Sequence, residues 1–426
     1  MTNVFLASFS MLFLLVSCVK EDCTRVMTYT KHTPVYKSYD EIRVDPVLEG
    51  ARSLEKPGKI YLYGSLILVN EVDEGVHIID NSNPSAPNNI AFIAIPGNVD
   101  IAMKGNTMYA DNYTDLLAID ISDINNIRLE SRVEDAFPNY GADPVNGILV
   151  KYLQEEVTEE VKCDDVAAWG GGNQFFDQGM QATATNTGGG VAASAGASGR
   201  EAVGLGGSMA RFAVYSNNLY VVDNQDMHVF DITTTGNPSK VNQVQIGWGW
   251  GIETIFPHED KLFIGSNTGM FIYDNSNPNN PTYMSEFQHA DACDPVFVDG
   301  DFAYVTLRSG TFCQNFTNQL DVIDITNLNN PSLVSTTQMS NPHGLSVADD
   351  KLYLCEGADG LKVFDVSNKH TIAENQLFHD NSLTPYDVIK VPNANRLLVV
   401  GKGGFYQYNT DDPTELKLLS QIVVEE

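Results

Sequence analysis

The stretch Leu320-Asp321-Val322-Ile323-Asp324, followed by Ile325-Thr326-Asn327 and then Asn330-Pro331, decides the fold of this chain. Alternating apolar residues closed by an acid are typical of a β-strand. The residues after the strand predict a turn, because Asp and Asn side chains accept hydrogen bonds from nearby backbone amides and Pro presets φ. We therefore assign the closing acid to turn formation, with cation binding as the alternative.

The same unit recurs along most of the chain. Six further copies are Val76-His77-Ile78-Ile79-Asp80, Leu116-Leu117-Ala118-Ile119-Asp120, Met227-His228-Val229-Phe230-Asp231, Met270-Phe271-Ile272-Tyr273-Asp274, Leu361-Lys362-Val363-Phe364-Asp365 and the weaker Phe405-Tyr406-Gln407-Tyr408-Asn409. Successive closing residues are 40, 111, 43, 50, 41 and 44 positions apart. Seven units are therefore expected, with one long interruption between the second and the third.

A period in the forties with several short strands per unit is typical of a propeller blade, because one four-stranded sheet cannot bury both of its faces alone. Each unit contains a first strand such as Leu345-Ser346-Val347 and a second such as Lys351 to Cys355. The motif forms the third strand, and a segment such as Leu333 to Gln338 forms the fourth. The sequence predicts an all-β protein, a seven-bladed β-propeller over residues 51–426.

These repeats resemble the LVIVD-repeat β-propeller proteins, whose motif is close to Leu320-Asp321-Val322-Ile323-Asp324. The resemblance runs from about Lys59 to the C-terminus, apart from the interruption. It implies a propeller of the kind found in cell-surface lipoproteins without a well-defined activity. It implies little about function, because one fold serves many functions.

The first residues predict an address. An apolar run from Phe5 to Val16, too short to span a bilayer, leads into Leu15-Val16-Ser17-Cys18, which resembles a bacterial lipobox. Residues 1–17 are expected to be a signal peptide, and Cys18 to carry diacylglycerol and an acyl chain such as palmitate. The run lacks the usual preceding Lys or Arg, and a plain secretory signal with a chance Cys is the alternative.

The residues after Cys18 extend this expectation. Val19-Lys20-Glu21-Asp22 looks like the signal that sends Bacteroidetes lipoproteins to the outer face of the outer membrane. Residues 18–50 are polar without a clear period and are expected to form a lipidated tether. In many propellers an N-terminal strand closes the ring by completing the last blade. The best strand here is Ile42-Arg43-Val44, and the mode of closure stays open.

The interruption, residues 140–208, lies between blades two and three. Its first part, from Ile148 to Val161, is expected to form a β-hairpin extension or a short strand leading to an acidic segment. The second part, Trp169 to Gly207, is rich in Gly, Ala, Ser, Thr and Asn, and such a composition buries too little apolar surface to offset chain entropy. We expect a mobile loop there, either a spacer or a lid, and no phosphate-binding motif occurs in it.

Charge restricts the class of partner. The chain has 25 basic and 55 acidic residues, a net charge of −30. This balance argues against nucleic acid or an anionic membrane surface as a partner. A solvated acidic coat explains it, and affinity for a divalent cation is the sharper alternative.

Polar residues at the start of the first strands are the main candidates for a ligand site. In propellers these strands surround the central channel. Aligning the units on the first turn places Asp294, His343 and Asp387 at one position, with Asp100, Arg211 and Glu253 one residue further along. Such a ring suits a cation, an amine or a hydroxyl-rich ligand, and His with carboxylates suits a metal such as zinc. Hydrogen bonding to channel water and neighbouring loops is the structural alternative.

An aromatic cluster adds a second candidate. Trp248 and Trp250 lie in Gly247-Trp248-Gly249-Trp250-Gly251, immediately before the first strand of blade four. Aromatic rings beside a channel can stack on a sugar or a peptide side chain. Packing between adjacent blades is the alternative.

An extracytoplasmic address permits disulfides. Cys293 and Cys313 both belong to blade five, the first at the channel end of its first strand and the second in the enlarged loop after its second strand, and are the candidate pair. Cys355 lies within an apolar strand and is expected to be a buried free thiol. No Cys-x-x-Cys pair indicates a structural zinc site.

No catalytic signature occurs in the chain: there is no Gly-x-Ser-x-Gly, no His-Glu-x-x-His and no kinase set. The sequence therefore favours a lipid-anchored, surface-exposed binding or scaffold module for an envelope protein or a glycan. The alternative is a hydrolase- or lyase-like enzyme that uses the polar ring at the channel mouth. No cofactor is identified.

Overall fold

The computed structural model describes residues 24–139, 141–162, 205–247, 251–289, 295–309 and 318–425. The chain divides into two compact units, residues 1–35 with 151–184 and residues 36–150 with 185–426. The second unit contains seven consecutive antiparallel sheets and is a seven-bladed β-propeller, as the repeats predict. None of the described helices is long and apolar enough to cross a membrane.

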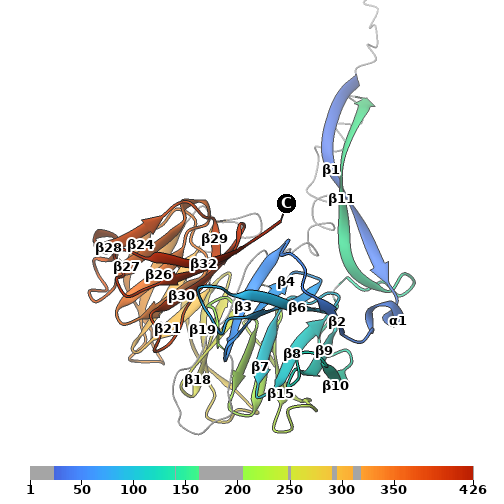
Figure 1. Cartoon of the computed structure of the whole chain (residues 1–426), viewed down its shortest axis with the longest axis horizontal. Helices are drawn as coiled ribbons and strands as arrows, with labels where there is room; N and C mark the ends of the chain where they lie inside the picture. Colours follow the sequence, from blue (N-terminus) through green and yellow to red (C-terminus); the bar gives the residue numbers. More distant parts are fainter. Residues whose placement is uncertain are drawn as a thin grey trace, which may run out of the picture. The chain divides into compact units, whose positions relative to one another are not determined.

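The blades follow chain order, from blue through green and yellow to red in Figure 1. Blade one comprises β3 (Pro57–Tyr63), β4 (Leu66–Glu71), β5 (Gly75–Asp80) and β6 (Asn88–Ala94). Blade two comprises β7 (Ile101–Lys104), β8 (Thr107–Asn112), β9 (Asp115–Asp120) and β10 (Arg128–Val133). Blade three comprises β13 (Phe212–Tyr215), β14 (Asn218–Val222), β15 (Asp226–Asp231) and β16 (Ser239–Gln245).

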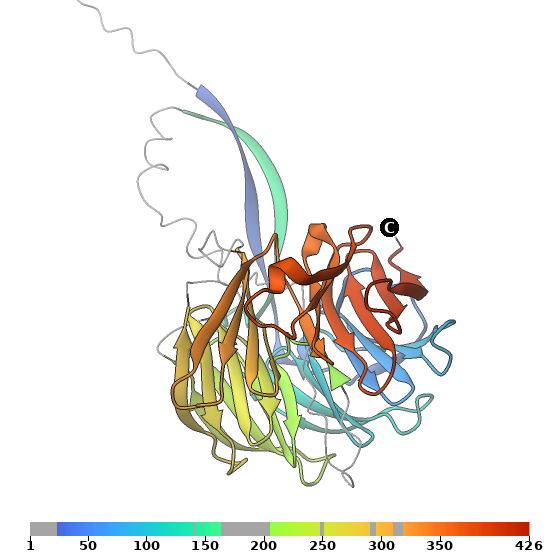
Figure 2. The same ribbon diagram turned by 90° about the vertical axis from the view of Figure 1, so that its left-hand side faces the viewer.

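The later blades repeat this order, and Figure 2 shows their strands side by side as twisted ribbons. Blades four to seven comprise β17 (Ile252–His258), β18 (Lys261–Ser266), β19 (Gly269–Asp274) and β20 (Thr282–Gln288); β21 (Val296–Asp299), β22 (Phe302–Leu307), β23 (Gln319–Asp324) and β24 (Ser332–Gln338); β25 (Leu345–Ala348), β26 (Lys351–Cys355), β27 (Leu361–Asp365) and β28 (Gln376–Asp380); β29 (Pro385–Lys390), β30 (Arg396–Gly401), β31 (Gly404–Asn409) and β32 (Lys417–Val423). Short 3₁₀ turns, η1 (Gly357–Asp359) and η2 (Ile372–Asn375), flank β27.

The repeat motif is the third strand of every blade, as predicted. Each closing residue accepts a hydrogen bond from the amide two positions later, as Asp324 does from Thr326 at 2.9 Å and Asn409 from Asp411 at 2.7 Å. Side-chain and backbone hydrogen bonds from Ser367 lower the pKa of Asp365 to about 2. The closing residues therefore form turns, which confirms the structural interpretation of the motif.

Apolar packing lies between blades. Each of the seven buried clusters combines residues of two neighbouring blades, and one of them joins Ile60 and Ile79 of blade one to Ile389 and Phe405 of blade seven. No single sheet supplies a core of its own. The fold therefore depends on a complete ring of neighbours.

Side chains and a single bridge close the ring, without an exchanged strand. Blade seven is built entirely from β29–β32, and Leu54 forms a parallel bridge with Val424. The amides of Asn81 and Gln407 hydrogen-bond to each other in both directions, at 3.1 and 2.7 Å. The structure thus settles the question that the sequence left open.

The segment proposed as a closing strand has other roles. Ile42 ends the short helix α1 (Tyr39–Ile42), and Arg43 follows it and pairs with the buried Asp115 of blade two at 2.9 Å. The next strand, β2 (Val47–Gly50), pairs with the outer edge of β6 in blade one. The N-terminal segment therefore extends the first blade and leaves the last one unchanged.

The first unit contains a two-stranded ribbon. β1 (Thr24–Lys37) pairs with β11 (Ile148–Lys162), where Thr28 and Thr158 hydroxyls lie 2.9 Å apart and the rings of His32 and Tyr152 are 6.4 Å apart. β11 matches the strand expected at the start of the insertion. Its partner β1 falls in the segment expected to be an irregular tether, where polar composition gave no period.

Candidate functional site

The strand register places seven residues at one level of the ring, each directly before the first-strand residue whose partner in the second strand pairs with the second residue of the motif. First strands contact the first strands of neighbouring blades, so this level surrounds the central axis. The seven positions, in blade order, are Lys59, Asp100, Arg211, Thr254, Pro295, Gly344 and Asp387. Three of them are candidates from the sequence, and Lys59 was missed.

The register also corrects the alignment made from sequence. Asp387 shares the level of Asp100 and Arg211, whereas His343 and Glu253 stand one residue earlier in their blades. The error arises from bulges, one between Pro385 and Asp387 and one between Ile252 and Thr254. A bulge adds a residue to one strand, so counting from the preceding turn gives the wrong level.

One part of the ring is an ion pair. Lys59 Nζ lies 2.8 Å from Asp100 Oδ2, and both side chains are buried. Burial lowers the pKa of Lys59, and the nearby Asp100 carboxylate only partly opposes this. Burial raises the pKa of the neighbouring Asp111 to about 6, against hydrogen bonds from the amides of Asp100 and Val99.

The end of the insertion occupies the centre of the ring. Leu205–Gly206 forms β12, which pairs with β3 of blade one and appears as a short light-green arrow in Figure 2. Ser208 Oγ then accepts a hydrogen bond from the backbone amide of Leu345 in blade six at 2.8 Å. The Ala210 carbonyl accepts one from the amide of Ile255 in blade four at 2.7 Å. We call residues 205–210 the plug, because they contact first strands on several sides.

The plug continues into blade three through Asp100. The Asp100 carboxylate accepts hydrogen bonds from the backbone amides of Arg211 at 2.8 Å and Phe212 at 3.1 Å, in addition to the one from the Lys59 ammonium. Arg211 turns its guanidinium to the Val222 carbonyl of its own blade, at 3.2 Å. Asp100 and Arg211 therefore hold the plug and blade three in place. The prediction of a mobile loop is wrong for its last residues, Leu205 to Gly207. Residues 169–204 lie outside the described ranges.

Asp387 lies against the plug. It is fully buried, and a β-carbon added to Gly207 would come within 2.0 Å of its Oδ2, so a larger residue there would displace the Asp387 side chain. Burial raises the pKa of Asp387 to about 7, although the amides of Val388 and Ser208 and the charge of Lys59 act in the other direction. Its carboxylate accepts no side-chain hydrogen bond within the described part of the chain.

The other part of the ring lies around Arg308. Burial lowers the pKa of Arg308, and the Glu253 carboxylate opposes this. Burial and the Arg308 charge lower the pKa of His343 to about 3, so His343 is neutral near pH 7. Arg308 therefore lies close enough to both Glu253 and His343 to affect their electrostatics.

Several predicted residues lie outside the described ranges: Cys18, Trp248, Trp250, Cys293, Asp294 and Cys313. Cys355 is a buried free thiol, as expected, and burial raises its pKa well above the usual range. Among the described residues, no group of three or more His, Cys, Asp or Glu side chains is arranged to hold a metal ion.

The repeats also contain buried acid–base pairs that the sequence analysis did not single out. The second residue of the motif pairs with an acid at the end of the second strand in blades one, three and six. The pairs are Glu71 with His77 at 3.0 Å, Asp223 with His228 at 2.8 Å, and Glu356 with Lys362 at 3.6 Å. A basic residue inside an apolar motif, with an acid five or six positions earlier, is a signal that could have revealed them.

One pocket includes a member of these pairs. It has a volume of about 380 Å³ and lies between the loop after blade two, helix α1 and blade three. The lining residues are Tyr39, Thr114, Asp135, Ala136, Phe137, Pro138, Asn139, Ala142, Ile148, His228, Lys240 and Gln243. We call it the His228 pocket.

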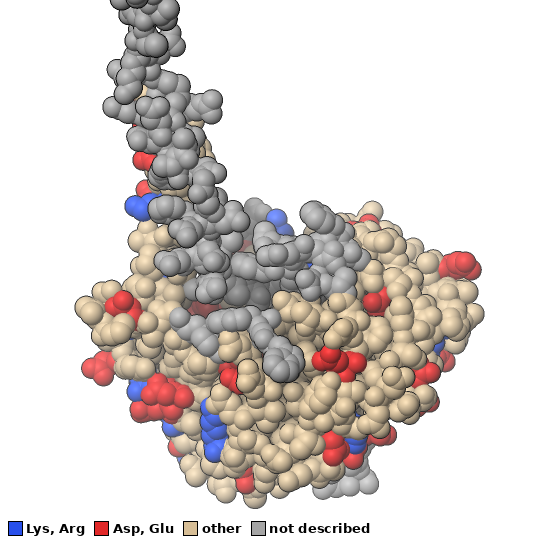
Figure 3. All heavy atoms as spheres, turned by 180° about the vertical axis from the view of Figure 1, so that it is seen from behind, with Lys and Arg blue, Asp and Glu red and all other residues tan. Residues whose placement is uncertain are grey.

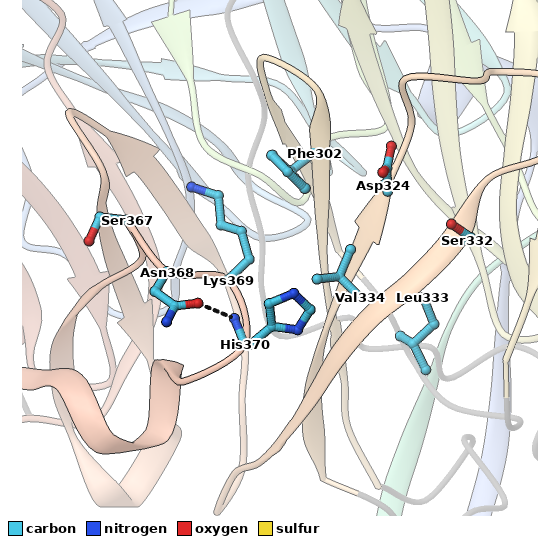
Figure 4. Close-up of a pocket in the computed structure, with 9 residues that line it drawn as sticks. All are labelled: Phe302, Asp324, Ser332, Leu333, Val334, Ser367, Asn368, Lys369 and His370. Atoms are coloured by element: carbon cyan, nitrogen blue, oxygen red, sulfur yellow. Dashed lines mark hydrogen bonds between the residues drawn. The ribbon is translucent and has the colours of Figure 1, made fainter.

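A second pocket, of about 530 Å³, lies between blades five and six (Figure 4). Figure 4 shows the Lys369 side chain extended toward Phe302, with Leu333 and Val334 on the other side. Its ammonium bonds to the Val366 carbonyl at 2.6 Å and lies 5.2 Å from the Phe302 ring. Because Lys369 is already satisfied by its own blade, this pocket offers few free polar groups.

Acidic side chains are spread over the face seen in Figure 3 and outnumber Lys and Arg there. Among the described residues as a whole, many acidic side chains are the turn-forming residues of the motif or members of local ion pairs, such as Asp274 with Lys261 at 3.1 Å. The described surface therefore agrees with a solvated acidic coat.

The fold and the pockets can now be compared with known proteins. The LVIVD repeat model matches residues 58–92, 97–135, 206–246 and 290–338, which correspond to blades one, two, three and five. No curated protein matches the chain.

Solved structures share the fold at low identity. A putative 6-phosphogluconolactonase from Bacteroides uniformis has a TM-score of 0.54 and 13% identity, covering 87% of this chain and 98% of that one. The periplasmic gluconolactonase PpgL of Pseudomonas aeruginosa has a TM-score of 0.51 and 10% identity, covering 89% and 97%. Similarity at this level supports the architecture alone. The chain therefore carries LVIVD repeats within a seven-bladed β-propeller.

Proposed function

We propose that this protein is a lipid-anchored, surface-exposed binding module that holds an envelope protein or a glycan through its loops. The main support is the plug. The chain itself occupies the centre of the ring, with hydrogen bonds to Leu345, Ile255 and blade one. The polar ring predicted as a ligand site is thus used internally, and binding falls to the surfaces outside it.

The address rests on the N-terminal sequence. Leu15-Val16-Ser17-Cys18 provides the acceptor for lipid, and Lys20-Glu21-Asp22 the signal for the outer face of the outer membrane. Two or more acyl chains give stable membrane attachment, whereas a single chain gives only reversible binding. The acidic composition, with a net charge of −30, suits a protein that stays in solution beside an anionic membrane.

Two measurements test the address. Cells fed an alkyne analogue of palmitate should label the wild-type protein and leave Cys18→Ala unlabelled. Protease added to intact cells should remove the propeller from the wild type. Label on Cys18→Ala, or complete protection in intact cells while a periplasmic marker is also protected, would contradict this address.

A pull-down tests the binding role. Intact cells are crosslinked, the lipidated protein is solubilised in detergent, and proteins and glycans that copurify in comparable amount are identified. A stoichiometric partner is expected. The variants Asp387→Asn and His343→Gln should retain that partner, because both residues lie at the plugged ring; loss of the partner in both correctly folded variants would refute the assignment to outer loops.

One observation favours the second candidate, a hydrolase- or lyase-like enzyme at the ring. The pKa of Asp387, raised to about 7 by burial, suits a residue that exchanges protons near neutrality. The structural relatives described as gluconolactonases make sugar lactones the first substrates to test. Turnover that disappears in Asp387→Asn, with folding preserved, would establish this function; unchanged background hydrolysis in the wild type would eliminate it.

A further inference from the structure

The His228 pocket contains a buried nitrogen without a partner. His228 is fully buried, its Nε2 lies 2.8 Å from Asp223 Oδ2, and its Nδ1 has no hydrogen-bond partner within the described ranges. The atom is shielded from bulk water. An unsatisfied buried polar atom beside a pocket indicates a missing partner, because leaving it unpaired costs about 1–3 kcal/mol.

The acid partner decides what Nδ1 can do. Burial acts to raise the pKa of Asp223, but the hydrogen bonds from His228 and from the amides of Gln225 and Asp226 lower it below the usual range. Asp223 is therefore an ionised carboxylate that only accepts hydrogen bonds, so Nε2 is the donor in this pair. Nδ1 is left without a partner among the described residues, and a hydroxyl group can pair with it because a hydroxyl can both donate and accept.

Lys240 supplies the complementary group. Its ammonium hydrogen-bonds the Ala136 carbonyl at 3.0 Å and Gln243 Oε1 at 3.1 Å, and forms no ion pair with any described carboxylate. It is an exposed side chain in a pocket that also contains His228. One ligand hydroxyl can donate to Nδ1 and accept from Lys240, because a hydroxyl has one donor and two acceptor positions.

Aromatic rings complete the pocket. The Phe137 ring packs edge-on against His228, with centroids 5.6 Å apart, and Tyr39 stays 42% exposed. Apolar ring faces combined with a few fixed polar groups suit a ligand that has a flat apolar side and hydroxyls around its edge. Asp135 is the one carboxylate among the lining residues; although it pairs with Arg43 at 2.9 Å, its side chain is 60% exposed and disfavours an anionic ligand at this site.

We infer that the His228 pocket binds a neutral saccharide unit, with a hydroxyl held between His228 and Lys240 and the sugar ring against Tyr39. This inference deepens the proposed function and rests on it for its biological setting. It specifies the class of partner and the residues that bind it.

Ligand-observed saturation-transfer NMR tests the inference. The full-length protein, in a detergent without a sugar headgroup, is mixed with the methyl glycosides of glucose, galactose, mannose and N-acetylglucosamine, and separately with N-acetylneuraminic acid. At least one neutral glycoside should receive saturation, and N-acetylneuraminic acid should not. Affinity for the responding glycoside is then measured by titration.

Three variants assign the signal. Lys240→Ala should weaken binding about tenfold or more, since it removes a charged hydrogen-bond donor. Gln243→Phe places at this position the residue type that blade one has, and should abolish binding. Lys417→Ala removes an exposed lysine from the corresponding strand of blade seven and should leave the affinity unchanged.

Each contrary result overturns the inference. Absence of transfer to every neutral glycoside, transfer to N-acetylneuraminic acid alone, or equal affinity in the wild type and Lys240→Ala would each do so. Anchoring is tested separately, because Cys18→Ala affects membrane attachment and leaves saccharide binding intact. A protein that is absent from the cell surface but binds a glycoside would therefore contradict the proposed address alone.

Discussion

Blades one and three contain the same buried pair in different surroundings. Glu71 with His77 and Asp223 with His228 occupy equivalent positions, because both histidines are the second motif residue and both acids end the second strand. In blade one, the remaining nitrogen of His77 lies 3.4 Å from the Asn89 amide, and the His77 ring packs edge-on against Phe92 at 4.8 Å. In blade three the second nitrogen of His228 has no partner among the residues that the structure describes, and the ring borders a pocket.

The fourth strand makes this difference. The residues equivalent to Asn89 and Phe92 of blade one are Lys240 and Gln243 of blade three, as the pairing with the motif strand shows. Arg52 covers Phe92, with its guanidinium carbon 3.5 Å from the ring centre. The repeat thus maintains the acid–base pair, while residues outside the motif decide whether the histidine is enclosed or available.

The largest predicted effect is a difference in stability loss when the histidine of each pair is replaced. His77→Leu should lower the free energy of unfolding by about 3 kcal/mol, because it removes the hydrogen bond from His77 to the Glu71 carboxylate, which is only 2% exposed. His228→Leu should cost about 1–2 kcal/mol, because the Asp223 side chain is 13% exposed and can regain a hydrogen bond from water, while both acids keep two backbone amide donors. Urea denaturation of both variants measures the difference, and equal losses would show that the two pairs are energetically alike.

Acidification provides the next test. Hydrogen bonds lower the pKa of Glu71 and Asp223 against the effect of burial, so their contribution to stability is present above the unfolded pKa and is lost as pH falls. Asp387 has the opposite sign: its pKa rises from 3.8 to about 7, so stability falls as pH rises through this range.

Asp387→Asn isolates that contribution. The variant should remove a loss of about 3 kcal/mol between pH 4 and pH 7 and retain the loss of stability at lower pH. Unfolding free energies measured across pH 3 to pH 8 for the wild type and the variant test this. Parallel curves would mean that Asp387 has an ordinary pKa in the folded protein.

Replacing the fourth-strand neighbours of His228 with those of His77 should enclose the His228 ring as the His77 ring is enclosed. The double variant Lys240→Asn and Gln243→Phe gives His228 the neighbours that His77 has, and should raise the free energy of unfolding by about 1 kcal/mol while saccharide binding is lost. Lys417→Ala provides the surface control. A destabilised double variant would show that the neighbouring Phe137 leaves no room for the new ring.

The smallest predicted effect comes from removing the hydrogen-bond donor beside His77 in blade one. Asn89→Ala removes the donor to His77 and the hydrogen bond from Asn89 to the Arg52 carbonyl at 2.7 Å, and should cost about 1 kcal/mol or less. It should create no saccharide site, because Phe92 still fills the space. Glycoside binding by Asn89→Ala at an affinity near that of the wild-type site would indicate that the fourth strand does not control access.

The fold was predictable because the motif contains both its strand and its turn. The alternation and the turn after it are local properties, and the structure reproduces them in every blade, with Asp-x-Ser or Asp-x-Thr in blades one to six and Asn-x-Asp in blade seven. The ring level was less predictable, since bulges before Asp387 and Thr254 change the count from turn to strand. Lys59 escaped notice because its importance depends on a partner in another blade.

The plug and the ribbon mark the limit of sequence reasoning. Leu205-Gly206-Gly207-Ser208 has the composition of a loop, and its order comes from hydrogen bonds to blades distant in the chain. β1 has no apolar face of its own and is paired with β11, more than a hundred residues away. Both elements are stabilised by tertiary contacts, which composition and period do not encode.

The plug also determines the order in which the molecule can be completed. It stands between blades two and three in the sequence, yet it contacts Leu345 and Asp387, which are synthesised well over a hundred residues later. While the chain emerges from the ribosome, the early blades can pair their strands, but the axis must wait for blades six and seven. A nascent chain truncated before Leu345 therefore lacks the residues of blades six and seven that contact the plug, and the plug can be fully held in the ring only after the last blades have been synthesised.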